Sequence, residues 1–158
     1  MYDLDKSSKA QEAMRHFREG YNCAQSVLLT FCKEARLGEE QAAALASSFG
    51  GGMGRLREVC GAVSGMLLAA GGVCGYADPA DRAAKTRHYE LVQFLAEEFR
   101  QAEGSIVCRE LLHLEQKSDR PVPEERTAEY YRKRPCAELV GRAACILERY
   151  LKERAGGL

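Results

Sequence analysis

The stretch VCGAVSGMLLAAGGVCGYA, residues 59–77, decides the fold of this chain, because it is long and carries no charged side chain. Glycine occupies positions 61, 65, 71, 72 and 75. The strongly apolar residues are few, so insertion into a bilayer would gain little compared with a leucine-rich span. We therefore expect a buried, glycine-rich helix at the centre of a helical bundle, and no membrane association.

One flank of this expected helix carries little side-chain bulk. Gly61 and Gly65 allow another backbone to approach closely. The favoured interpretation is a crowded crossing between two helices at the centre of the bundle. The alternative is that these small residues clear space beside Cys60 for a partner thiol, a metal centre or a substrate.

Apolar residues recur at helical spacing on both sides of this stretch. The expected helices cover residues 8–18, 22–35, 39–48, 57–70, 78–102 and 135–154, with a short helix around Cys108. Asp78 and Pro79 are the expected start of the longest helix. Its expected buried stripe consists of Leu91, Phe94, Leu95 and Phe99. Without a convincing strand pattern, the sequence predicts an all-α bundle of about five to seven helices.

Length and charge set further limits. The 158 residues match one ordinary domain, so we expect residues 1–158 to form a single helical domain, with a polar surface excursion over 115–134 that carries Pro121 and Pro123. The 23 basic residues balance the 23 acidic ones, which indicates no nucleic-acid partner. The first residues lack a basic stretch followed by an apolar core, so we predict a cytoplasmic location.

The chain has seven cysteines, which in a reducing compartment favour catalytic, redox or metal-binding thiols over structural disulfides. Four of them fall at or near expected helix starts: Cys23, Cys60, Cys108 and Cys136. A helix N-terminus carries partial positive charge and free N–H groups, which lower the pKa of a thiol placed there. This shared placement predicts one functional set of cysteines, acting as catalytic thiols or, alternatively, as metal ligands.

The other cysteines, Cys32, Cys74 and Cys145, have apolar or small neighbours, and we expect them to pack as small hydrophobic residues in the core. One of the three histidines, His113, follows Cys108 by five residues. The two do not share a helix face cleanly, so a surface or structural role is expected for this histidine.

A glycine-rich loop, GGGMG at residues 50–54, precedes Arg55 and Arg57 and an expected helix start. Such a loop can form an anion-binding nest of backbone N–H groups. It lacks the Lys-Ser/Thr of a P-loop and does not follow a strand, so a flexible connector is the favoured interpretation.

Metal centres with four cysteine ligands usually include a close pair such as Cys-x-x-Cys, and this sequence has none. A zinc or iron–sulfur centre would therefore have to be assembled by tertiary folding. The same absence removes the thioredoxin signature, and the absence of Cys-x-x-Cys-His excludes ordinary c-type haem attachment. If the four cysteines act as redox thiols and not as metal ligands, they can form two disulfides in three different pairings.

Five short pieces of sequence occur in a characteristic order: NCAQ at 22–25, FGGGMG at 49–54, CGAVSG at 60–65, CRELL at 108–112 and PC at 135–136. Together they resemble the C_GCAxxG_C_C family of small bacterial and archaeal proteins, which are described as redox-active. The resemblance covers most of the chain, and its Cys-Gly-Ala-x-x-Gly element is complete. The family's four characteristic cysteines fall on Cys23, Cys60, Cys108 and Cys136.

The resemblance implies a redox or cofactor-associated role and association with a transport system. A related helical domain is attached to haem-binding cytochrome segments, but this chain lacks the haem motif, so haem is not carried over. An iron–sulfur centre is compatible with the resemblance.

Three hypotheses follow. The leading one is a thiol redox protein, with the activity of a thiol oxidoreductase and an unidentified redox partner, whose four cysteines converge and cycle between dithiols and disulfides. The second is a protein that binds zinc or an iron–sulfur cluster through the same cysteines. The third is a helical interaction module, such as a homodimer, whose cysteines only pack.

Overall fold

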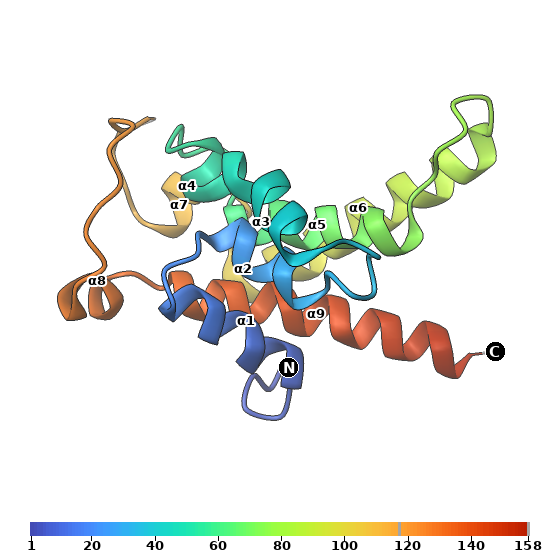
Figure 1. The fold of residues 1–158 in the computed structure, drawn as a ribbon, viewed down its shortest axis with the longest axis horizontal. Helices are drawn as coiled ribbons and strands as arrows, with labels where there is room; N and C mark the ends of the chain where they lie inside the picture. Colours follow the sequence, from blue (N-terminus) through green and yellow to red (C-terminus); the bar gives the residue numbers. More distant parts are fainter. Residues whose placement is uncertain (117, 158) are drawn as a thin grey trace.

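The computed structural model describes residues 1–116 and 118–157, which form a bundle of helices (Figure 1). Within these ranges there is no strand, although an isolated β-bridge pairs Val59 with Val107. The helices are α1 (Ser8–Arg18), α2 (Cys23–Thr30), α3 (Glu39–Ala46), the 3₁₀ helix η1 (Ser47–Phe49), α4 (Gly50–Met53), α5 (Gly61–Cys74), α6 (Arg82–Glu103), α7 (Cys108–Leu111), α8 (Ala128–Lys133) and α9 (Cys136–Gly156). The predicted all-α bundle is confirmed, and six helices of the described ranges have eight residues or more.

Helix α5 lies at the centre of the bundle and packs against α2, α6 and α9 (Figure 1). A Cβ atom at Gly65 would lie 2.6 Å from the carbonyl oxygen of Ala24 on α2, so a larger residue would force the two helices apart. The predicted glycine-rich central helix and its crowded crossing are therefore confirmed. In the described part of the chain, no helix has both the length and the apolar character of a membrane span.

The long helix α9 runs beside α1, and a buried carboxylate joins the two. Glu148 on α9 accepts hydrogen bonds from the hydroxyls of Ser7 and Ser8, at 2.5 and 3.1 Å. The Ser7 hydroxyl oxygen also accepts from the backbone N–H of Ala10 at 2.9 Å, which caps the start of α1. These contacts fix the position of α9, whose first residue is Cys136.

Helix α6 begins later than the sequence analysis predicts. Asp78 instead stabilises a turn by accepting from the Ala80 N–H, and Asp81 caps the helix by accepting from the Ala84 N–H at 2.8 Å. Two aspartates three residues apart both suit an N-cap, and the second one has that role. The predicted buried stripe holds except at Phe94, which is 44% exposed and packs against Tyr150 at the surface.

Candidate functional site

Each of the four candidate cysteines stands at a helix start. Cys23, Cys108 and Cys136 are the first residues of α2, α7 and α9, and Cys60 is the N-cap residue of α5. The predicted placement at helix starts is therefore found for all four.

The same four cysteines line one cavity of about 240 Å³. Three of them are buried, and Cys23 is half-buried. The helices that carry these cysteines come from separate parts of the chain. Their positively polarised N-termini converge on this cavity. The sequence does not determine whether the cysteines form one site or two, whereas the fold arranges them around a single cavity.

The backbone bridge between Val59 and Val107 fixes the positions of Cys60 and Cys108. The N–H of Cys60 donates to the carbonyl of Ile106 at 2.8 Å. The N–H of Cys108 donates to the carbonyl of Glu58 at 2.6 Å. These two hydrogen bonds hold the start of α5 against the start of α7, so both sulfur atoms reach the same cavity.

A capping box fixes the start of α2. The side-chain oxygen of Asn22 accepts a hydrogen bond from the Gln25 N–H at 2.9 Å, and the Gln25 side chain accepts one from the Asn22 N–H at 3.0 Å. Asn22 also packs closely on Gly50, where a Cβ atom would lie 2.5 Å from the asparagine side chain. The glycine-rich loop therefore contacts the residue that precedes Cys23.

This loop forms a wall of the cavity, which corrects the interpretation of residues 50–54 as a flexible connector. Gly52 is buried with φ +69°, a conformation that favours glycine. A Cβ atom there would lie 2.6 Å from the Cβ of Cys108. The loop folds back on itself through hydrogen bonds from the Arg57 and Glu58 N–H groups to the carbonyls of Gly51 and Gly52. Glycine thus allows the loop to pack directly on a cavity cysteine.

Cys23 and Cys136 interact inside the cavity, and this interaction separates their acidities. The side chain of Cys23 lowers the pKa of Cys136; burial opposes this effect, and the charges of Arg134 and Arg126 reinforce it. The side chain of Cys136, together with burial, raises the pKa of Cys23. Cys136 is therefore the more acidic thiol of the pair.

The other two cavity cysteines favour the neutral thiol. Burial raises the pKa of Cys60 to about 12. Burial also raises the pKa of Cys108, although Arg57 opposes it by placing Nη1 3.7 Å from the Cys108 sulfur. The expectation that a helix start makes each of the four a favoured thiolate is wrong for Cys23, Cys60 and Cys108. The neighbouring Cys136 and burial at Cys23, and burial at Cys60 and Cys108, outweigh the helix N-terminus at these positions.

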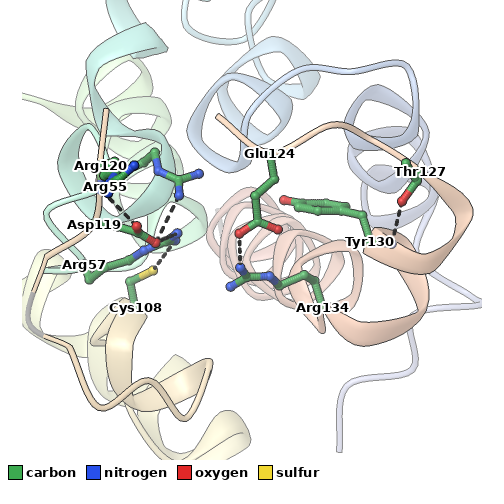
Figure 2. A network of polar contacts seen from close by, with 9 residues as sticks. All are labelled: Arg55, Arg57, Cys108, Asp119, Arg120, Glu124, Thr127, Tyr130 and Arg134. Carbon is green, nitrogen blue, oxygen red and sulfur yellow. Dashed lines mark hydrogen bonds and ion pairs between the residues drawn. The ribbon is translucent and has the colours of Figure 1, made fainter. Parts of the chain in front are cut away.

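Arg57 connects Cys108 to an acidic partner (Figure 2). It is buried, and its Nη2 lies 3.1 Å from Asp119 Oδ2, while Arg55 Nη2 lies 3.0 Å from the same oxygen. The hydrogen bond from Arg57 is the main cause that lowers the pKa of Asp119 to about 2. Two arginines therefore share one carboxylate beside the cavity.

The described residues of the polar segment 115–134 run over the surface, as the sequence predicts, and several of their side chains also reach the cavity. Arg126 stacks 4.2 Å from the ring centroid of Phe17, and its Nη1 donates to the Phe17 carbonyl at 3.0 Å. Arg134 is ion-paired with Glu124, and Tyr130 lies beside this pair (Figure 2). All four of Arg126, Arg134, Glu124 and Tyr130 line the cysteine cavity. The segment thus closes one side of the site.

The sequence pattern does not single out these additional residues. Arg126 and Tyr130 lie in a stretch rich in charge and proline, a composition typical of a solvated loop. Arg134 offers the one local signal, because it stands two residues before Cys136. The position of Arg126 depends on its contacts with Phe17 on α1, which lies far away in the sequence.

The remaining cysteines and His113 lie outside the cavity. Cys32 and Cys145 are buried, in agreement with their expected packing role. Cys74 is half-buried, and its sulfur lies 2.7 Å from Arg154 Nη1. His113 is exposed on the loop after α7.

The fit of the cavity to a single metal ion can be judged from the arrangement of its ligand atoms. Across residues 1–116 and 118–157, no group of three His, Cys, Asp or Glu side chains is arranged to hold a metal ion. Four cysteines do line the cavity, but in this conformation they do not form the compact set that a tetrahedral zinc site requires.

Comparison with known proteins gives one match. A family model described as "Putative redox-active protein (C_GCAxxG_C_C)" matches residues 21–150, which include all four cavity cysteines. No curated protein and no solved structure matches the chain. Because the family model spans most of the sequence and its cysteines are the ones that meet at the cavity, the chain belongs to the C_GCAxxG_C_C family.

Proposed function

We propose that this protein is a thiol redox protein in which Cys23 and Cys136 cycle between a dithiol and a disulfide. The observation that carries the proposal is the meeting of these two cysteines at one cavity, where their interaction lowers the pKa of Cys136 and raises that of Cys23. A thiolate is the form that attacks a disulfide, and a neighbouring thiol can then complete the exchange. The family description supports a general redox role.

In the first step, the Cys136 thiolate attacks one sulfur of a substrate disulfide. A mixed disulfide forms, and one substrate thiolate leaves. Cys136 then carries no negative charge, so the ionisation of Cys23 is no longer opposed by a neighbouring anion.

In the second step, Cys23 loses its proton to the departing thiolate or to water and attacks the Cys136 sulfur. The second substrate thiolate leaves, and a Cys23–Cys136 disulfide remains. Two electrons pass from the cysteine pair to the substrate, which is reduced from a disulfide to two thiols. A second dithiol, the unidentified redox partner, restores the pair by the reverse chemistry.

Cys60 and Cys108 remain protonated during this cycle at neutral pH. Burial keeps the pKa of Cys60 near 12, and it also raises the pKa of Cys108. Their part in the proposal is to complete the lining of the cavity without competing as nucleophiles. Oxidation then removes two hydrogens from the protein rather than four.

The proposal places the protein in the cytoplasm, as one helical domain. A reducing thiol pool would return the cysteine pair to the dithiol form after each turnover.

A metal centre on the same cysteines is the second candidate. The observation that favours it is the meeting of four cysteines at one cavity, since four thiolates are the usual ligands of iron–sulfur clusters. The absence of a compact group of three ligands in the described residues counts against a single bound ion. A cluster would therefore require the cysteine side chains to rearrange.

Mass spectrometry separates the two candidates. Protein purified without oxygen is measured in its native state, after denaturation, and after oxidation with bis(2-hydroxyethyl) disulfide. We expect an apo mass, a loss of two hydrogens on oxidation, and a cross-linked peptide that joins Cys23 to Cys136. A metal or iron–sulfide increment that disappears on denaturation would support the second candidate instead.

Matched variants identify the residues involved. Cys136→Ser should abolish the cross-linked peptide, whereas Cys145→Ser changes a cysteine of the same helix outside the cavity and should leave it intact. Oxidation that joins any other pair in the wild-type protein would refute the assignment of Cys23 and Cys136.

A further inference from the structure

The cysteine cavity has an unusual charge for a chain whose acidic and basic residues balance. The basic residues in its lining are Arg55, Arg57, Arg126 and Arg134. Among the described lining residues, Glu124 is the one carboxylate. Asp119 offsets part of the charge from just outside, and a thiolate at Cys136 would offset another part. A positive balance remains inside the cavity.

Two of these arginines have unused hydrogen-bond donors. The Nε atoms of Arg55 and Arg57 are buried, and within the described residues neither has a hydrogen-bond partner. Arg57 is only 5% exposed, so its free donor is not simply solvated. A buried guanidinium donor without a partner is costly unless an acceptor reaches it. Both arginines line the cavity, so an anionic ligand there would meet guanidinium groups whose donors are not all engaged.

The size of the cavity limits what can enter. At about 240 Å³ it is smaller than ordinary sites for drug-sized ligands, yet it is lined by all four cysteines. A compact molecule with a few non-hydrogen atoms on either side of a sulfur–sulfur bond matches this size. A folded protein could not place more than one side chain there.

From the charge, the free donors and the size, we infer that the substrate of the proposed redox function is a small disulfide that carries carboxylate groups. This inference rests on the proposed function and adds the substrate class. A thiolate normally repels an anionic disulfide, and the arginines remove that repulsion by binding the carboxylates. The substrate accepts two electrons from Cys23 and Cys136 and leaves as two carboxylate-bearing thiols, as in the two steps above.

The first test compares two alkylating reagents that differ mainly in charge, iodoacetate and iodoacetamide. Rates are measured at Cys136 by peptide mass spectrometry, in folded protein and in urea. The ratio of the two rates cancels the fraction of thiolate, because both reagents attack the same ionised sulfur. We expect the ratio of iodoacetate to iodoacetamide to be about tenfold higher in the folded protein and to fall as salt is added.

Neighbouring residues provide a matched pair of variants. Arg134 lines the cavity and is ion-paired with Glu124, whereas Lys133 lies outside the cavity lining and is ion-paired with Glu129. Arg134→Gln and Lys133→Gln each remove one positive charge and release one glutamate. We expect Arg134→Gln to lower the reagent ratio by at least about threefold and Lys133→Gln to leave it unchanged.

The second test uses three disulfides with the same two-carbon spacers: 3,3′-dithiodipropionate, bis(2-hydroxyethyl) disulfide and cystamine. Each rate in the wild-type protein is divided by the rate in Arg134→Gln, so that differences in leaving group cancel. We expect the rate in the wild-type protein divided by the rate in Arg134→Gln to be highest for 3,3′-dithiodipropionate and lowest for cystamine.

The outcomes distinguish this inference from the proposed function. Equal quotients for the three disulfides, or equal reagent ratios in folded and unfolded protein, would overturn the inference and leave the redox proposal standing. A similar decrease in the ratio of iodoacetate to iodoacetamide rates in Arg134→Gln and Lys133→Gln would also overturn the inference. The effect would then come from the overall charge of the protein and not from the cavity. No Cys23–Cys136 disulfide with any of the reagents would refute the proposed function itself.

Discussion

Cys23 and Cys136 line the same cavity, although the two residues begin helices at opposite ends of the family match. Their interaction lowers the pKa of Cys136 and raises that of Cys23, so two chemically identical side chains become a more acidic and a less acidic thiol. The assignment of roles in the proposed exchange depends on this asymmetry, since a symmetric pair of buried thiols would contain no favoured nucleophile.

Replacing Cys23 by alanine removes the side chain that most lowers the pKa of Cys136, so that pKa should rise. The pH dependence of iodoacetamide labelling at Cys136 measures this change. Cys145→Ala, on the same helix, serves as the control and should leave the midpoint in place. An unchanged midpoint in Cys23→Ala would show that other groups produce the asymmetry.

Cys60 should make the fold less stable at alkaline pH. Its pKa is about 12 in the folded protein and lies near 9.0 without burial, so between these values the unfolded chain loses a proton that the folded chain keeps. Stability then falls as pH rises, by about 1.4 kcal/mol per pH unit from this group. Urea denaturation from pH 8 to pH 11 should show a shallower decline in Cys60→Ala than in the wild-type protein. Identical slopes would indicate that Cys60 ionises normally in the fold.

Asp119 should give the opposite dependence in acid. Its pKa is about 2 in the folded protein against a usual 3.8, so the stabilisation is complete above that usual value and is lost as pH falls toward 2. Asp119→Asn should lack this acid-dependent loss when the two proteins are compared by denaturation between pH 5 and pH 2. Asp3→Asn gives a comparison at an exposed site, where the partner is the exposed Lys6 rather than two arginines. If the free energy of unfolding depends on pH in the same way in the wild-type protein and in Asp119→Asn, the pairing of Asp119 with Arg55 and Arg57 would be contradicted.

Gly52→Ala should damage both the fold and the site. The added Cβ would lie 2.6 Å from the Cβ of Cys108, at a backbone φ of +69°. The overlap and the strain together should cost about 2 kcal/mol or more in the free energy of unfolding. Gly38→Ala is the matched control, because no atom lies within 4 Å of its Cβ position and its φ is ordinary. Equal denaturation midpoints for the two variants would mean that the loop yields easily at Gly52.

The elements that sequence predicts well are those with local causes. The start of α2 follows from Asn22 and Gln25, which satisfy each other within one turn of backbone. The central helix α5 follows from its uncharged, glycine-rich composition. The placement of all four cavity cysteines at helix starts could be predicted from the sequence, although the distant pairing of Val59 with Val107 also holds Cys60 and Cys108 in place.

The properties of the site depend on distant contacts, and for that reason they could not be predicted. The pKa of Cys60 is raised by burial that exists only after the helices pack. Arg126 reaches the cavity because it stacks on Phe17, which lies more than a hundred residues earlier. The position of a cysteine at a helix start predicts that the helix N-terminus lowers the pKa of its thiol. Tertiary packing decides whether burial raises that pKa by more.

The assembly of the cavity from four separate helix starts has a consequence for the life of the chain in the cell. A polypeptide that is still being synthesised contains Cys23, Cys60 and Cys108 long before Cys136 exists, and during that time its thiols have ordinary reactivity. The two cysteines of the proposed exchange meet only when the last helix docks beside the first two. Under the proposed function, the reactivity of this protein would therefore appear at the end of its maturation, and a chain cut before α9 would lack it.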